Sequence, residues 1–384
     1  MTPYYETPLG KLYHGNVSDV LLQLESESVQ MCVTSPPYWG LRDYGNPPTI
    51  WDAKEGCDHV WGDEKIIKAE GLAGSGVGKI HMGSSCNPRD NGLILKYDAS
   101  QGQFCQLCGA WLGCLGLEPT PELYTRHMVQ VFREVKRVLR ADGTLWLNLG
   151  DSYAGGGTGG HIDNKASVIE KAPSHNVVKT LKPKDLCGIP WRVAFALQAD
   201  GWYLRQDIIW QKPNPMPESV KDRCTKAHEY MFLMSKNGRY FYDADAVKSK
   251  ILNSSINRAK YPSAKRKEGV TVPATQKRWN VKEGVSWKET QSGYRNKRSV
   301  WTIPTQPYPA AHFATFPTTL IEPCIFAGSR EGDIVLDPFF GAETTGLVCE
   351  KYNRKWIGIE LSEPYAEIAA KRIESEASQL KLWG

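Results

Sequence analysis

The 384-residue sequence contains no apolar run that approaches the ~20 residues of a membrane-spanning helix. Its first ten residues, MTPYYETPLG, lack the basic start and the apolar stretch of a signal peptide. These two absences predict a cytoplasmic protein without a membrane partner. In that compartment we do not expect the ten cysteines to form a disulfide framework, so their spacing is more informative than their number.

The net charge is only +5, but the charged residues are unevenly distributed along the chain. Residues 246–300 contain 14 Lys or Arg and three Glu, so this segment carries about +11 and the remainder about −6. Aromatic residues are interleaved with these cations, namely Tyr261, Trp279, Trp287, Tyr294 and Trp301. A basic segment on a mildly acidic body favours contact with a polyanion. A solvated linker is the alternative that charge alone leaves open.

Apolar patterning predicts strands that alternate with helices. Short apolar runs bounded by turn residues predict strands at 29–34, 144–149, 203–210, 230–234, 333–337 and 355–360. Apolar residues at three- and four-residue spacing predict a helix that opens at 119–121 and ends at 141–143, and further helices at 190–199, 318–327, 344–351 and 363–380. This alternation predicts an α/β fold with a doubly wound, mostly parallel sheet. The stretch 46–117 has little periodicity, which indicates an insertion.

Residues 34–39, Thr-Ser-Pro-Pro-Tyr-Trp, follow the first predicted strand. Ligands of open α/β sheets bind beyond the carboxyl ends of the strands, and the prolines Pro36 and Pro37 fix the backbone there. Ser35 Oγ and the Pro36 carbonyl can accept hydrogen bonds from both hydrogens of a base amino group, which would favour a tetrahedral nitrogen with an available lone pair. Tyr38 can stack on a base that is flipped from the helix. A plain proline turn is the alternative.

Residues 337–346, Asp-Pro-Phe-Phe-Gly-Ala-Glu-Thr-Thr-Gly, form a turn between a predicted strand and a predicted helix. Such a turn can wrap the methionine part of a nucleotide-like cofactor. Its candidate contacts are Asp337, Pro338, Phe339, Gly341, Thr344 and Thr345. Because an aromatic face attracts a cation, we expect Phe339 near a sulfonium. Glu360 ends the next strand, where an acidic side chain takes the ribose hydroxyls in dinucleotide folds. A plain glycine turn is the alternative.

Together these motifs resemble the permuted, beta-class amino-methyltransferases of DNA, in which SPPY precedes a DPFxGxGTT cofactor loop. The resemblance covers nearly the whole chain outside the insertion. It implies a Rossmann-like fold with circularly permuted motif order, S-adenosylmethionine as the cofactor, and double-stranded DNA as the partner. It also implies that His312 and Phe316 contact the cofactor. One residue departs from the pattern, because Glu343 stands where the family has glycine, and its carboxylate is expected to clash with or repel the methionine carboxylate.

The serine of SPPY resembles the cytosine-N4 enzymes, so the expected reaction is methyl transfer to N4 of cytosine, with adenine N6 as the alternative target. Two alternatives come from other classes: a non-catalytic DNA-binding protein whose cofactor loop is degenerate at Glu343, and a methyltransferase acting on RNA or protein. Pro323-Cys324 is similar to the Pro-Cys nucleophile of cytosine-C5 enzymes. We reject that chemistry because this thiol lies in an apolar predicted helix, which suits a small buried side chain.

The resemblance divides the chain into five parts. Residues 1–45 carry SPPY, 46–117 form the insert, 118–245 continue the methyltransferase domain, 246–303 form the basic target-recognition region, and 304–384 bind the cofactor. The expected DNA contacts are Lys265, Arg266, Lys267, Lys277 and Arg278. The resemblance also raises a restriction endonuclease as a functional partner.

Four residues of the insert have the donor types of a zinc site. Cys105 and Cys108, followed by Gly109, form a CxxC-Gly knuckle typical of zinc ribbons. Cys57 and His59 are the upstream candidates for the other two ligands. A structural zinc ion would stabilise a segment that has little core of its own. Unligated thiols are the alternative.

Overall fold

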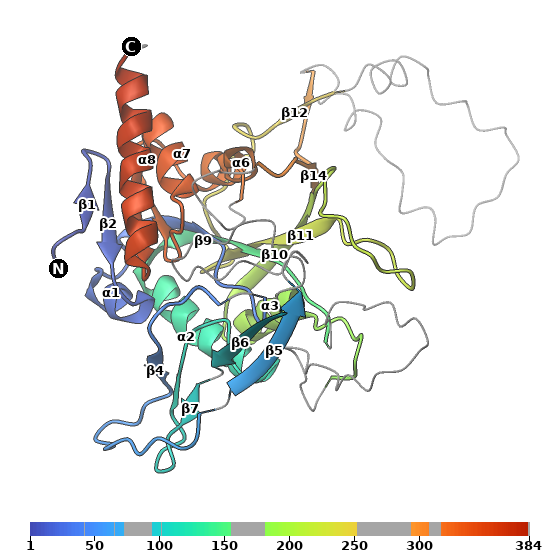
Figure 1. Ribbon diagram of the computed structural model, residues 1–384. Helices are drawn as coiled ribbons and strands as arrows, with labels where there is room; N and C mark the ends of the chain where they lie inside the picture. Colours follow the sequence, from blue (N-terminus) through green and yellow to red (C-terminus); the bar gives the residue numbers. More distant parts are fainter. Residues whose placement is uncertain are drawn as a thin grey trace, which may run out of the picture.

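The computed structural model describes residues 1–41, 43–64, 66–72, 94–100, 102–154, 181–251, 293–306 and 316–382, with 66–72, 94–100 and 376–382 described by their backbone (Figure 1). A nine-stranded sheet runs through the centre of the molecule. In spatial order its strands are β1 (Tyr5–Glu6), β2 (Gly10–His14), β16 (Lys355–Glu360), β15 (Ile334–Asp337), β3 (Val29–Thr34), β9 (Leu139–Leu149), β11 (His228–Ser235), β10 (Tyr203–Gln211) and β14 (Val300–Thr302).

The centre of this sheet is parallel. Strands β2, β16, β15, β3 and β9 pair with one another in the same direction. Strand β11 reverses the direction, since it is antiparallel to both β9 and β10, and β14 then pairs in parallel with β10. The predicted α/β fold with a mostly parallel sheet is therefore confirmed.

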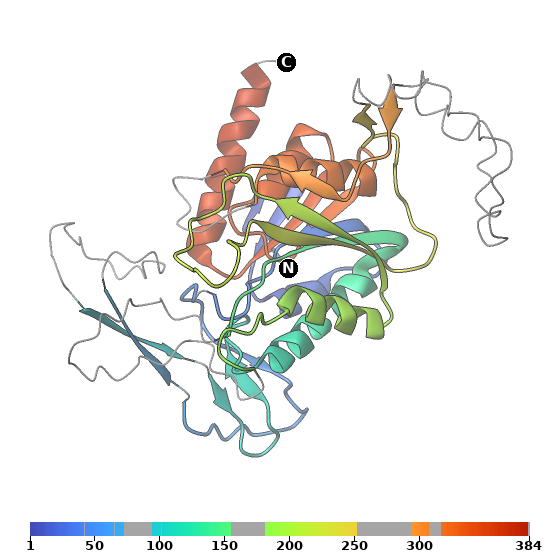
Figure 2. The same cartoon turned by 90° about the vertical axis from the view of Figure 1, so that its right-hand side faces the viewer.

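Helices cover both faces of the sheet (Figure 2). One face carries α1 (Val17–Gln23), α2 (Pro121–Val138) and α3 (Ile189–Ala199), and the other carries α6 (Thr318–Gly328), α7 (Thr344–Lys351) and α8 (Glu363–Leu382). Successive side chains of a strand point to opposite faces, so each core receives alternate residues. Along β9, Leu145 and Leu147 enter the first core and Trp146 enters the second. None of the helices described is long and apolar enough to cross a membrane.

The junction between α2 and β9 differs from the prediction. Thr120 caps α2, and its side chain accepts a hydrogen bond from the backbone N–H of Leu123. The helix ends at Val138 and the strand begins at once, with residues 141–143 inside the strand instead of in a turn before it. The register against β3 shifts here, because Val29 pairs with Leu139 whereas Met31 pairs with Thr144. The turn residues are thus accommodated as a bulge, which adds residues to one strand only.

The insert consists of small antiparallel units. Strands β4 (Thr49–Trp51), β8 (Trp111–Gly113) and β7 (Gln103–Phe104) form one sheet, and β5 (Ile66–Leu72) pairs with β6 (Ile94–Ser100) in a second. Trp51 and Trp111 are buried in the same core as the apolar face of α2. These two tryptophans of the insert therefore pack on α2, where both stack on His127.

Candidate active site

The SPPY motif and the cofactor loop lie side by side, although they are far apart in sequence. Strand β3, which ends at Thr34, pairs in parallel with β15, which ends at Asp337. The Thr34 hydroxyl donates to Asp337 Oδ1 at 2.6 Å, and the Thr345 hydroxyl donates to Oδ2 at 2.6 Å. Burial raises the pKa of Asp337 to about 6, and these hydrogen bonds oppose the rise. The carboxyl ends of two neighbouring strands thus hold both motifs, where ligands of open α/β sheets bind.

The cofactor loop, residues 337–345, is hydrogen-bonded to Glu360 at the end of β16. Gly341 N–H donates to Glu360 Oε2 and Ser362 N–H donates to Oε1, both at 2.8 Å. Burial raises the pKa of this carboxyl. Each carboxylate oxygen has two lone pairs, so each can still accept one hydroxyl hydrogen. The residue chemistry therefore fits a ribose at the position that the sequence predicted.

The two phenylalanines of the cofactor loop pack on opposite faces of the central sheet. Phe340 is buried and stacks on Trp356 of β16, with the ring centroids 5.2 Å apart. Phe339 is half-buried and packs against the opposite core. Gly341 has φ +51°, a left-handed conformation that glycine adopts without strain, and among the described residues beyond its chain neighbours a Cβ added there would have only the Phe339 carbonyl within 4 Å, at 3.9 Å. This glycine side of the loop is open enough for a ligand to approach the backbone.

Glu343, the departure from the family pattern, is accommodated by the last helix. Its φ is +64° and its side chain is fully buried. Oε1 lies 3.4 Å from Arg372 Nε of α8, and Arg372 also donates to the Ala342 carbonyl at 2.7 Å. The carboxylate is thus directed toward a cation that also holds the loop backbone. The fold therefore accommodates the Glu343 carboxylate through a charge contact with Arg372.

Tyr38 is held by its hydroxyl at the end of β3. The oxygen lies 2.9 Å from Asn148 Oδ1 and 2.8 Å from Glu229 Oε2, and the Ser35 hydroxyl is 3.2 Å away. Burial and the charge of Glu229 raise the pKa of Tyr38 well above its usual value. The ring packs over Gly150, where an added Cβ would lie 2.5 Å from Tyr38 Cε2. The aromatic ring therefore has one fixed position at the candidate site.

Two of these partners were not predicted from the sequence. Glu229 lies in the partly buried start of β11 and forms an ion pair with Lys212, whose ammonium also lies 4.4 Å from the ring centroid of Trp210. No local pattern distinguishes Glu229 from other polar residues at strand ends. Asn148 had a signal, since it is a polar residue inside an apolar strand, and it is 1% exposed and donates to the Tyr230 carbonyl at 3.0 Å.

The backbone of the SPPY loop, residues 35–39, is anchored on α2 and the end of the insert. Tyr124 donates to the Pro37 carbonyl at 2.8 Å, and Trp39 Nε1 donates to the Glu118 carbonyl at 2.9 Å. No hydrogen bond from the described part of the chain reaches the Pro36 carbonyl. A rigid loop with an available carbonyl fits the acceptor array that an exocyclic amine requires.

The remaining candidates fall into three groups. Phe316 precedes α6 and packs against the core of that face. His312 and the cations Lys265, Arg266, Lys267, Lys277 and Arg278 lie outside the described residues. Cys324 is buried inside α6, where burial raises its pKa far above the usual thiol value. A thiol that resists ionisation in a closed core cannot serve as the nucleophile of a C5 mechanism.

A family model of N6 and N4 DNA methylases matches residues 29–371. The chain belongs to this family. A type II methyltransferase of Citrobacter freundii, M.Cfr9I, is 38% identical over 366 residues, which cover 95% of this chain and 88% of the relative. M.SmaI of Serratia marcescens is 38% identical over 364 residues, which cover 94% of this chain and 90% of the relative.

A solved structure, the PvuII DNA methyltransferase described as cytosine-N4-specific, shares the fold of this methylase. It aligns with a TM-score of 0.53 and 17% sequence identity, and the alignment covers 98% of this chain and 94% of that chain. At this identity the likeness concerns the fold. The fold, the two adjacent motifs and the family match agree that the chain is a DNA methyltransferase.

Proposed function

We propose that the chain transfers a methyl group from S-adenosylmethionine to N4 of cytosine in double-stranded DNA. The observation that carries this proposal is the hydrogen bond between Thr34, the residue before Ser35, and Asp337, the first residue of the cofactor loop. The SPPY sequence and the fold shared with an enzyme described as cytosine-N4-specific support cytosine as the target. The relatives are named type II methyltransferases, which supports a role in modifying the sites that a restriction endonuclease would cut.

The cofactor-binding surface would be built by the loop 337–345, Glu360 and Phe316. When bound, S-adenosylmethionine supplies an electrophilic methyl group on a sulfonium. Glu360 would accept the ribose hydroxyls, because its oxygens are fixed by two backbone amides. Phe339 would face the sulfonium, where its ring attracts a positive charge. We place His312 at the same surface on the family pattern.

The amine would be activated by acceptors of the SPPY loop. Ser35 Oγ and the Pro36 carbonyl would accept hydrogen bonds from its two N–H groups. The nitrogen would then become more tetrahedral, and its lone pair would be less conjugated with the ring and available for attack. The transfer would form a nitrogen–carbon bond as the sulfur–carbon bond breaks, S-adenosylhomocysteine would leave, and the proton lost from the amine would pass to solvent. No covalent bond between enzyme and base is needed, which agrees with the buried position of Cys324.

Tyr38 would hold the flipped base by stacking. Three polar neighbours fix its hydroxyl and Gly150 leaves room for its ring, so little side-chain freedom is lost when a base arrives. Stacking of a base on an aromatic side chain is worth about 1–3 kcal/mol. A preformed ring therefore offsets part of the cost of extruding the base.

We further propose that the basic region 246–303 contacts the DNA through Lys265, Arg266, Lys267, Lys277 and Arg278. Its two ends pair with each other, since β12 (Ser249–Lys250) pairs with β13 (Tyr294–Arg295), and β14 then joins the central sheet beside β10. Lysine and arginine contacts to phosphates weaken binding as salt is added. Neutral substitution of the first three cations should lower affinity for all sequences and flatten its salt dependence.

Sequencing that detects modified bases in DNA from cells expressing the chain tests the whole proposal. We expect a modified cytosine at one recurrent sequence context. DNA that carries no recurrent modification, from cells in which the protein is folded and abundant, would contradict the proposal.

A further inference from the structure

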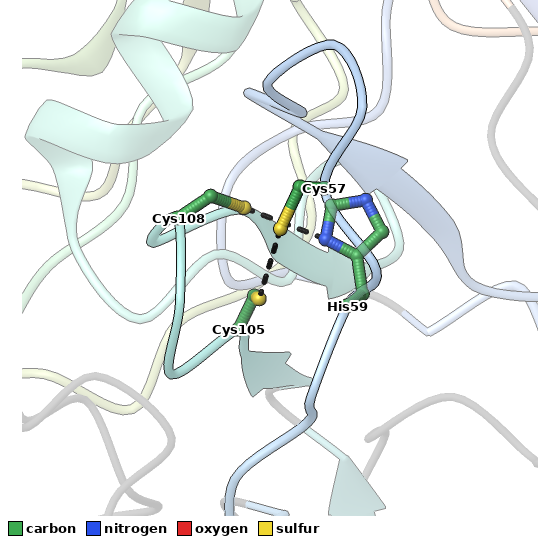
Figure 3. Close-up of side chains that lie close together, drawn as sticks. All are labelled: Cys57, His59, Cys105 and Cys108. Carbon is green, nitrogen blue, oxygen red and sulfur yellow. Dashed lines mark hydrogen bonds between the residues drawn. The ribbon is translucent and has the colours of Figure 1, made fainter.

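Four metal-binding side chains of the insert converge although they come from two distant segments. Cys57 and His59 lie in the loop after β4, and Cys105 and Cys108 lie in the turn after β7 (Figure 3). Their ligand atoms all lie within 4.8 Å of one another. Cys57 Sγ is 3.9 Å from Cys105 Sγ, and Cys108 Sγ is 3.4 Å from His59 Nδ1. The side chains of the two segments thus point at one common centre.

These distances match a tetrahedral zinc centre. With Zn–S of about 2.3 Å and Zn–N of about 2.0 Å, tetrahedral geometry separates two sulfurs by about 3.8 Å and a sulfur from a nitrogen by about 3.5 Å. A disulfide would require about 2.05 Å between the sulfurs. The measured 3.9 Å and 3.4 Å therefore fit ligands of one ion and exclude an S–S bond.

The backbone around Cys105 has the shape of a metal-binding knuckle. Gly109 has φ +77°, and its N–H donates to the Cys105 carbonyl at 3.0 Å, which closes the turn. The Cys105 N–H donates to the Ala110 carbonyl at 2.7 Å. This closed turn from Cys105 to Gly109 is the backbone shape that a CxxC-Gly knuckle requires.

We propose that Cys57, His59, Cys105 and Cys108 bind one structural zinc ion, and that this ion holds the insert in the position where it supports the SPPY loop. Three thiolates and one imidazole are a donor set that selects zinc. All four tetrahedral positions are filled by protein, so the ion has no open position for catalysis. Its role is to stabilise the segment that carries it.

A continuous set of contacts joins the knuckle to the SPPY loop. Phe104, next to Cys105, pairs with Trp111 across the β7–β8 ladder. Trp111 stacks on His127 of α2 with centroids 5.3 Å apart, and Trp51 stacks on the same imidazole at 4.7 Å. If the knuckle unfolded, the β7–β8 pairing that holds Trp111 would be lost, and the stacking of the two tryptophans on His127 would be weakened.

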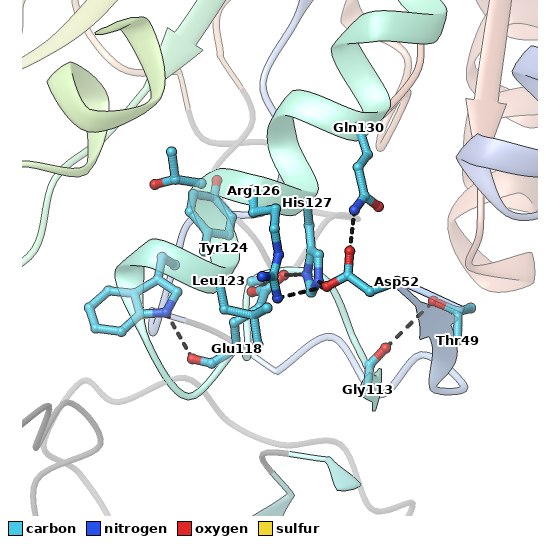
Figure 4. Close-up of polar contacts among 12 residues, drawn as sticks. Thr49, Asp52, Gly113, Glu118, Leu123, Tyr124, Arg126, His127 and Gln130 are labelled. Atoms are coloured by element: carbon cyan, nitrogen blue, oxygen red, sulfur yellow. Dashed lines mark hydrogen bonds and ion pairs between the residues drawn. The ribbon is translucent and has the colours of Figure 1, made fainter. Parts of the chain in front are cut away.

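His127 also contacts Glu118, which is hydrogen-bonded to the SPPY loop (Figure 4). His127 Nδ1 lies 2.9 Å from Glu118 Oε1, inside the core. The backbone carbonyl of Glu118 accepts the indole N–H of Trp39, and the Gly40 N–H donates to the Gly116 carbonyl at 2.8 Å. The last residues of the insert and the first residue after it are therefore hydrogen-bonded to the end of the SPPY loop and to Gly40, which follows it, whereas the cofactor loop lies on strands β15 and β16.

Metal analysis of the full chain, purified without chelator, tests the site. We expect about one zinc per chain, as a single four-ligand site requires. Cys105→Ser should lose the metal, while Cys114→Ser, a half-buried cysteine of the same insert, should keep it. His59→Cys supplies a fourth thiolate and should also keep it. Folded wild-type protein without zinc, or Cys105→Ser with full zinc content, would overturn the site.

Cobalt substitution gives a second readout that does not depend on activity. Cobalt in the wild-type site should show the ligand-field absorption of a tetrahedral thiolate centre, and His59→Cys should shift it. Octahedral cobalt absorption in both proteins would overturn the ligand set.

The support of the SPPY loop is tested by removing zinc with a strong chelator and then restoring it. The stripped protein should unfold at lower temperature, and its kcat should fall while KM for S-adenosylmethionine stays within about twofold, because none of the described residues of the insert is hydrogen-bonded to the cofactor loop. Restored zinc should reverse both changes. An unchanged unfolding temperature and kcat would overturn the structural role, whereas the metal content tests the site even if the methylation target differs.

Discussion

Thr34 Oγ1 lies 2.6 Å from Asp337 Oδ1 and joins two strand ends that are 303 residues apart in the chain. Thr345 donates to the other oxygen of the same carboxylate, so Asp337 connects the SPPY strand, the cofactor loop and the start of α7. One buried group thereby sets the distance between the side that would hold the base and the side that would hold the cofactor. The geometry of methyl transfer depends on that distance.

The titration of Asp337 should be visible in the stability of the protein. Its pKa is raised from 3.8 to about 6, so the folded protein binds a proton that the unfolded chain releases between about pH 4 and 6. The contribution of this group to stability therefore increases as pH falls through that window and is lost as pH rises through 6. Asp337→Asn cannot titrate. The free energy of unfolding of the wild type relative to this variant should rise between pH 7 and pH 5, and a constant difference would contradict the raised pKa.

The hydroxyl and the ring of Tyr38 should have separable effects. Tyr38→Phe keeps the ring but loses the hydroxyl bonded to Asn148 and Glu229, so kcat should fall by about tenfold as the ring position becomes less defined. Tyr38→Ala also loses stacking worth about 1–3 kcal/mol and should be more damaging. Tyr203→Phe, an exposed tyrosine on β10, is the matched control. Steady-state methylation kinetics measure these effects. Equal activity of the phenylalanine and alanine variants would show that the ring does not hold the base.

Glu343→Gly should weaken the cofactor loop even though glycine suits its backbone. Relief of a left-handed conformation is worth about 1–2 kcal/mol. Removing one partner of a buried ion pair costs about 3–5 kcal/mol, so loss of the contact with Arg372 should dominate. Denaturant unfolding should show lower stability, and calorimetry should show weaker cofactor binding.

Asn353→Gly is the control for that variant, because Asn353 also has a positive φ, of 56°, but is exposed. This change should leave stability equal or slightly higher. If Glu343→Gly instead bound the cofactor more tightly at unchanged stability, the carboxylate would be repelling the cofactor as the family pattern first suggested.

Local sequence signals predicted most of the elements, and the differences have physical causes. The helix over residues 121–138 has a clear apolar face and a threonine cap, so its position follows from its own sequence. The short strands β1 and β2 and the helix α1 carry too few periodic residues to be recognised. Residues 141–143 have turn chemistry but form a bulge, because pairing with β3 and β11 continues on the following residues.

The parts of the site were predictable in different degrees. The motifs at 34–39 and 337–346 were visible as sequences, but their adjacency depends on strand order, which no local pattern encodes. The four candidate zinc ligands could be proposed from their spacing. Glu229 and Arg372 act through partners brought close by the fold, on β3 and the cofactor loop, so neither could be assigned a role before the strand order was known.

Identification of the methylated nucleoside tests the central claim most directly. Unmethylated DNA would be incubated with the protein and S-adenosylmethionine, digested to nucleosides, and analysed by mass and retention, with Tyr38→Ala as the inactive control and Cys324→Ser as an active one. The account predicts N4-methylcytosine with wild type and Cys324→Ser alike. N6-methyladenine would contradict the proposed target, and 5-methylcytosine that disappears in Cys324→Ser would contradict the mechanism as well.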